Sequence, residues 1–200
     1  MAGEALPLID LIISRAIERI TANAGLDKPL GYAIRKVEPF DGQVNETQMA
    51  QLLQVTPAVF VAFAKGSGAE QGQGRKWAVT LSIIVVTRNL ATPDAARIGK
   101  GTEVGANRIA EDMAILFDRQ RLGLEIDEIE PVDITPIVPG WARTHKAAIV
   151  GLTCKTGYTV DLPGADPAEL AEFLRARFDF DMAPQDGQGD SSITVNTRTA

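Results

Sequence analysis

Residues 74–89, GRKWAVTLSIIVVTRN, constrain the fold of this chain more than any other stretch, because their apolar side chains alternate. In an extended chain one face would be apolar throughout, which is the pattern of a half-buried β-strand. That face holds Trp77, Val79, Leu81, Ile83 and Val85. Ile84 and Val86 make the opposite face apolar as well, but only toward the far end of the strand. We expect another copy of the same protein to cover part of this second face.

Helix-like and strand-like segments follow one another along the rest of the chain. Helices are predicted at about 7–25, at 92–122 with a break at Gly99 and Gly101, and at 166–180. Further strands are predicted at 31–40, 57–64, 124–138 and 146–162. Consecutive strands joined by loops favour antiparallel pairing. The sequence therefore predicts an α+β fold, with a mostly antiparallel or mixed sheet of about four to six strands and helices packed on one face.

The predicted organisation is one main domain followed by an appendage. Residues 1–163 form the α+β domain, residues 164–180 a C-terminal amphipathic helix, and residues 181–200 a flexible polar tail. Within the domain, the glycine-rich segment 65–76 is predicted to be a flexible loop that joins two strands into a long hairpin. Pro131 and Pro136 confine the later part of segment 124–138 to a sheet edge or to loops.

Composition and charge argue against several classes of protein. The formal charge of -6 argues against a general nucleic-acid binder, because such a protein needs a basic face to displace counterions from phosphates. No apolar run approaches the roughly 18 residues of a membrane-spanning helix, so we predict no membrane partner. Asp10 and the charges after it break the N-terminal apolar run, which argues against a signal peptide. Cys154 is the one cysteine, so an internal disulfide is excluded.

No group of residues forms a catalytic or cofactor-binding motif. His145 and Cys154 are the one candidate pair of base and thiol, but their odd spacing places them on opposite faces of an unbroken strand. The segment GKGTEVG, residues 99–105, lacks the spacing of a phosphate-binding loop and is predicted to be a hinge between two helical pieces. We therefore predict no catalytic residue and no cofactor.

Acidic residues between 125 and 133 are the remaining candidate for a metal site: Glu125, Asp127, Glu128, Glu130 and Asp133. Their carboxylates are ligands that calcium or magnesium prefers. The segment lacks the glycine and the spacing of a calcium-binding loop, so the sequence favours a solvated acidic face or a surface for basic residues, and predicts no metal ligand. A metal-dependent hydrolase is the enzyme alternative, which calorimetry with magnesium, calcium or manganese would exclude if no heat of binding appeared.

Basic and apolar residues in interaction-prone positions indicate a contact surface instead. Lys65, Arg75 and Lys76 flank the glycine-rich segment, where they would either protect a strand edge by charge or dock onto an acidic neighbour. Large aromatic residues also remain in a loop and on the C-terminal helix, which is typical of contacts between chains. The predicted interface residues are Lys65, Arg75, Lys76, Trp77, Ile84, Val86, Trp141, Phe173 and Phe178.

Several segments between about residues 6 and 162 together resemble a known family. They include PAVFVAFAKGSG, RKWAVTLSIIVVTRNL, IGKGTEVGANRIAEDMAILF, LEIDEIEPVDITPI and KAAIVGLTCKTGYTVDL. The chain resembles the Mu-like phage tail proteins that are assigned the tail terminator role in contractile-tailed phages and prophages.

That resemblance implies an α+β subunit that forms a hexameric ring at the head-proximal end of the tail tube. The ring would stop tube polymerisation and join the tail to the head connector, with no cofactor and no reaction. The implied partners are the tube, the sheath and the neck proteins, and the implied location is the virion after assembly in the cytoplasm of the bacterial host. The alternative is another neck or head–tail joining component.

Overall fold

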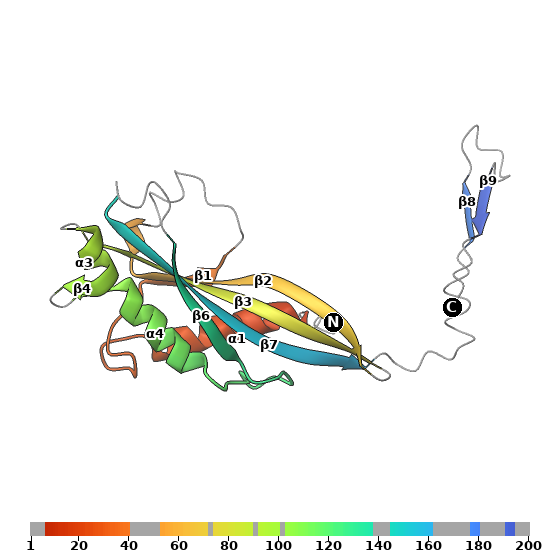
Figure 1. Cartoon of the computed structure of the whole chain (residues 1–200), viewed down its shortest axis with the longest axis horizontal. Coiled ribbons are helices and arrows are strands. Elements are labelled where there is room, and N and C mark those ends of the chain that lie inside the picture. The colour runs from red at the N-terminus through yellow and green to blue at the C-terminus, as the bar shows by residue number, and fades with distance from the viewer. Residues whose placement is uncertain are drawn as a thin grey trace, which may run out of the picture.

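A five-stranded mixed sheet forms the centre of the molecule (Figure 1). The computed structural model describes residues 7–40, 53–71, 74–89, 92–100, 103–137, 145–161, 177–180 and 191–194. The sheet has the order β1-β2-β3-β7-β6, and only β1 and β2 pair in parallel. Its strands are β1 (Lys36–Pro39), β2 (Ala58–Gln71), β3 (Gly74–Arg88), β7 (Ala147–Asp161) and β6 (Glu130–Ile137). The predicted α+β fold is confirmed.

Two helices cover one face of this sheet (Figure 1). Helix α1 (Leu8–Asn23) follows Pro7 and buries a stripe of Ile12, Ala16 and Ile20, as its three- and four-residue apolar spacing requires. Helix α4 (Ala106–Phe117) buries Ile109, Met113 and Phe117 in the same cluster. No helix among the described residues is long and apolar enough to cross a bilayer.

The alternation in the central strand is confirmed. Val79, Leu81, Ile83 and Val85 of β3 are each at most 1% exposed and face the helices. Val150, Leu152 and Cys154 of the neighbouring strand β7 join them in one core. Because β3 is paired on both sides from Gly74 to Val86, its apolar face is the middle of that core.

The second apolar face is covered by the chain itself at the end where Val86 lies. Val86 is 3% exposed and belongs to a second, smaller cluster on the face opposite the helices. This cluster also contains Leu53, from the 3₁₀ helix η1 (Leu53–Val55), and Phe60, whose ring meets that of Phe40 edge-on at 6.2 Å. Val86 is therefore covered by its own chain, and its contact with another copy stays a prediction. Ile84 is half-buried against the same cluster.

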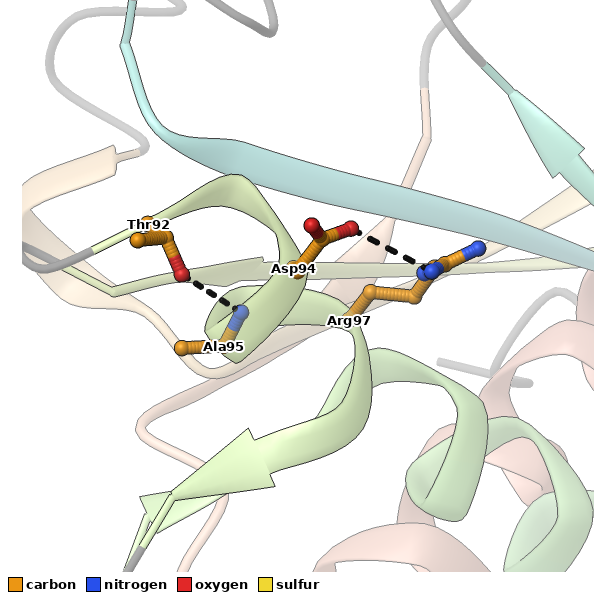
Figure 2. Close-up of polar contacts among 4 residues, drawn as sticks. All are labelled: Thr92, Asp94, Ala95 and Arg97. Carbon is orange, nitrogen blue, oxygen red and sulfur yellow. Dashed lines mark hydrogen bonds and ion pairs between the residues drawn. The ribbon is translucent and has the colours of Figure 1, made fainter.

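A short helix and a tight hairpin connect β3 to α4. Helix α3 (Pro93–Ile98) is followed by β4 (Gly99–Lys100) and β5 (Glu103–Val104), so the predicted break between two helical pieces is confirmed. The Thr92 hydroxyl accepts a hydrogen bond from the Ala95 N–H at 3.1 Å and caps the helix (Figure 2). Arg97 pairs with Asp94 one turn earlier at 3.2 Å, as Figure 2 also shows.

The strand predicted at 31–40 is shorter than expected. Strand β1 begins only at Lys36, and Tyr32 instead accepts a backbone hydrogen bond from Gly25 at 2.7 Å. The Tyr32 hydroxyl donates to Asp112 at 3.0 Å, and Arg108 donates to the same carboxylate oxygen at 2.9 Å. Burial, followed by the Asp112 charge, raises the pKa of Tyr32 well above its ordinary value. This buried network ties the segment after α1 to α4.

The C-terminal part contains two short strands. Strands β8 (Arg177–Phe180) and β9 (Ser191–Thr194) pair antiparallel in a sheet of their own. The helix predicted for 164–180 is therefore wrong over its last four residues, and its earlier part lies outside the described residues. Likewise, β9 falls within the tail predicted to be flexible, and the remaining residues of 181–200 lie outside the described part of the chain.

Candidate interaction surface

Strands β2, β3 and β7 continue beyond the helices as a three-stranded ribbon (Figure 1). We call this ribbon the arm, and define it as residues 65–71, 74–78 and 157–161. Along β3 the buried apolar residues end at Val79, and Tyr158 of the arm is half-buried against the core, whereas Lys65, Ser67 and Ala78 are exposed. The flexible loop predicted for 65–76 is therefore wrong for residues 65–71 and 74–76, which pair in continuous register up to Gln71 and Gly74, and residues 72 and 73 lie outside the described residues.

The glycine-rich run forms a strand because larger side chains lie over its glycines. A Cβ atom at Gly66 would lie 3.1 Å from the ring of Phe63, and one at Gly68 would lie 3.1 Å from Arg75 and 3.4 Å from Trp77. The aromatic rings and the Arg75 stem thus occupy the space that side chains at 66 and 68 would fill. This cover compensates for the low strand preference of glycine.

An ion pair and three backbone groups fasten the loop before β6 to the arm. Lys76 pairs with Asp127 at 2.9 Å. The Asp127 N–H donates to the Gly157 carbonyl at 2.6 Å, and the Thr156 hydroxyl donates to the Asp127 carbonyl at 2.7 Å. Lys76, a predicted interface residue, is therefore already engaged within its own chain.

The fit around Gly157 predicts that alanine at this position will destabilise the arm. An added Cβ would lie 2.7 Å from the Asp127 carboxylate and 2.9 Å from the Trp77 carbonyl oxygen. We expect Gly157→Ala to lower the free energy of unfolding by about 2 kcal/mol, measured by urea denaturation. Gly151→Ala is the control, because its closest neighbour is the flexible end of Ile137 at 3.2 Å, and it should cost less than half as much. Equal effects would contradict the predicted close fit.

Among the residues that the structure describes, the sheet has one open edge and one obstructed edge. On the β2 side, β1 pairs only with residues Ala58 to Val61, and the last bond on that side runs from the Phe40 N–H to the Val61 carbonyl at 2.9 Å. No described residue pairs with the outer side of β2 from 62 to 71. On the other side, β6 contains Pro131 and Pro136 and a register shift after Pro131, as predicted for an edge strand.

The structure divides the predicted interface residues into two groups. Lys65, Arg75, Lys76 and Trp77 lie together on the arm, whereas Ile84 and Val86 lie at the opposite end of β3. Phe178 lies in β8, and Trp141 and Phe173 lie outside the described residues. Sequence reasoning missed Phe63, which is 42% exposed in β2 directly before the β-bulge that precedes the arm. Its position two residues before Lys65, a predicted interface residue, could have indicated that Phe63 belongs to the same surface.

The thiol of Cys154 is a core group. It is 1% exposed on the face of β7 that the helices cover, and burial raises its pKa from 9.0 to about 12. A thiol with this pKa stays protonated at neutral pH, and the thiolate is the nucleophilic form. His145 lies in the turn before β7, and the first residue of that strand, Ala147, is seven residues or about 23 Å from Cys154.

The raised pKa of Cys154 predicts a loss of stability in alkaline solution. Because the thiol ionises near 9 when unfolded and near 12 when folded, its contribution is complete below pH 9 and is lost as pH rises toward 12. We expect the free energy of unfolding to fall by about 1.4 kcal/mol per pH unit above 9 from this group. Cys154→Ala should show a shallower fall between pH 8 and 10.5 in urea denaturation, and an unchanged slope would contradict the assignment.

Three of the five acidic residues of 125–133 have separate partners. Besides the Lys76 pair of Asp127, Glu128 lies 3.7 Å from Arg121, and Asp133 accepts a hydrogen bond from Thr135 at 2.6 Å. Over the described part of the chain, no three His, Cys, Asp or Glu side chains are placed to hold a metal ion. In the glycine segment 99–105, the Asn89 amide donates to Glu103, and Gly105 packs against the Gly99 backbone.

Comparison with known proteins gives one family. The sequence model of a family described as "Bacteriophage Mu, Gp37" matches residues 12–159. This range begins within α1 and ends near the tip of the arm in β7, so it includes the five-stranded sheet and both covering helices. No curated protein matches the chain.

Proposed function

The chain belongs to the family described as Bacteriophage Mu, Gp37, and is a phage structural protein; from this premise we propose that it is a tail terminator. In this role a hexameric ring of the protein sits at the head-proximal end of the tail tube. The ring stops tube polymerisation and offers a surface to the head connector. Its partners are other copies of itself, the tube, the sheath and the neck proteins.

The observation that carries this proposal is the arm. A ring formed by head-to-tail contacts needs two different surfaces on each subunit that fit one another. The arm provides one candidate, because it extends beyond the helices (Figure 1) and no described residue pairs with its outer edge on β2. Val160 is 41% exposed on the arm, and Phe63, two residues before the arm in β2, is 42% exposed. Partly exposed apolar groups beside an open strand edge are typical of protein contacts.

Light scattering of the purified protein tests the ring. Six chains of 21.4 kDa give about 128 kDa, and closed rings are the expected products of head-to-tail contacts. A 128 kDa species in solution, or one that forms when tail tubes are added, supports the proposal. A monomer that binds no tail tube contradicts it.

Electron microscopy of particles that lack this protein separates the terminator from its closest alternative. Tails of excessive length are the expected result, because tube growth would continue without a terminator. Tails of normal length that remain detached from heads would instead identify another neck or head–tail joining component.

A further inference from the structure

We propose that the open edge of β2, residues 62–71, binds the C-terminal segment 162–200 of a second copy, in a contact that extends the sheet. This inference rests on the proposed ring and names one of the contacts that would close it. Strand addition to an exposed sheet edge provides main-chain hydrogen bonds and thus affinity.

The open edge of β2 can accept a strand, and the opposite edge of the sheet is poorly suited to do so. Strand β2 contains no proline, so its outward backbone groups keep their donors and acceptors over about ten residues. Strand β6 has lost two N–H donors to Pro131 and Pro136 and is interrupted by a bulge. An added strand therefore makes more backbone hydrogen bonds on β2.

The C-terminal segment has strands that need a larger sheet. Strands β8 and β9 have four residues each and form a two-stranded sheet separate from the five-stranded one. A two-stranded ribbon of this size is at best marginally stable in water, and three or more strands are needed for independent stability. Joining the edge of β2 supplies that larger sheet.

The position and the charge of the C-terminal segment also fit the arm. Strand β7 ends at Asp161, which is paired with Gly74, and Gly74 is paired with Gln71 at the end of the open edge. Residues 162–200 contain seven acidic and three basic residues, a formal charge of -4, whereas residues 62–76 together with Asp127, the ion-pair partner of Lys76, contain three basic and two acidic residues, a charge of +1. Opposite charges favour their association.

The C-terminal segment and the edge of β2 are two different surfaces of each chain. The segment of one copy can therefore pair with the edge of the next copy. The pairing of such surfaces between neighbouring chains is the head-to-tail contact that closes a ring. Within the chain, β8 and β9 are separate from the sheet that contains β2.

Cysteine cross-linking in the full-length protein tests this contact. One chain carries Ser67→Cys on the exposed arm portion of β2, and a differently tagged chain carries Ser192→Cys in β9. The two are mixed at the concentration at which light scattering detects the ring, or with tail tubes present, and treated with a short bis-maleimide. We expect a covalent product of about twice 21.4 kDa that carries both tags. The native Cys154 is buried, so the unmodified chain is the blank.

A matched control pair keeps Ser192→Cys and moves the other cysteine from β2 to the obstructed edge of the sheet. Thr135→Cys is also exposed on an edge strand, β6, and mixed with Ser192→Cys it should yield at least tenfold less product. Equal yields, no product, or a product that forms only within the double variant Ser67→Cys/Ser192→Cys would overturn the contact. If a 128 kDa ring forms but Ser67→Cys and Ser192→Cys are not cross-linked, the proposed contact is wrong and the proposed function is still supported. A monomer that binds no tubes removes both.

Discussion

Replacing Phe117 with alanine is expected to lower the free energy of unfolding by about 4 kcal/mol, which would leave little of the stability of an ordinary domain. Phe117 is 1% exposed at the end of α4 and packs in the core between the helix and the sheet. Removing the phenyl ring loses the free energy gained by transferring it from water to the core. It also leaves a cavity that the surrounding strands cannot fill without moving. Urea denaturation followed by circular dichroism measures the loss.

The same helix offers the control for this prediction. Ile115 is 76% exposed on the solvent side of α4, so Ile115→Ala should change the free energy of unfolding by less than about 0.5 kcal/mol. Both variants keep helix-forming residues, which removes helix propensity as the explanation. If the two variants were equally stable, α4 would not pack on the sheet by the face described above.

The second large effect is expected at Gly105, where the chain enters α4. A Cβ at this position would lie 2.3 Å from the Gly99 nitrogen and from the Ile98 carbonyl carbon, and 2.4 Å from the Arg97 carbonyl oxygen. All three are backbone atoms, so α3 and α4 would have to separate. We expect Gly105→Ala to lower the free energy of unfolding by about 3 kcal/mol, again measured in urea.

The backbone angles of Gly105 allow steric and conformational effects to be distinguished. Its φ is -83°, a value that alanine adopts without strain, so the predicted loss is purely steric. Gly123 is the reverse case, with a φ of +71° and open space around it. Gly123→Ala should therefore cost only about 1 kcal/mol from backbone strain. A larger loss at Gly123 than at Gly105 would contradict the close packing of the two glycine backbones.

The elements with strong periodicity could be predicted from the sequence. The alternation in 74–89 gave the core face of β3 because burial of one face is what that pattern achieves. The glycines at 99 and 101 indicated the break before α4, and the two prolines of β6 indicated an edge strand. In each case the local chemistry alone favours the observed structure.

The arm could not be predicted in this way, because its stability depends on contacts between strands. Glycine-rich residues 65–76 have low intrinsic preference for strands, and only the paired structure brings Phe63 and Trp77 over Gly66 and Gly68. The cover on Val86 likewise comes from Leu53 and Phe60, which only the fold brings near it. The sequence therefore indicated the basic and aromatic residues that lie on the arm, but it did not predict that they lie on a three-stranded ribbon.

The two prolines and the bulge in β6 also limit how far copies of this sheet can join. Amyloid-like fibres need strands that accept a neighbour on both sides, so that hydrogen bonding repeats without end. Here the β6 edge of the sheet is deficient in hydrogen-bond donors. Edge-to-edge pairing of one sheet with the next should therefore cease after a single addition. This chain can therefore keep a long receptive backbone at high concentration and still resist forming insoluble fibrils.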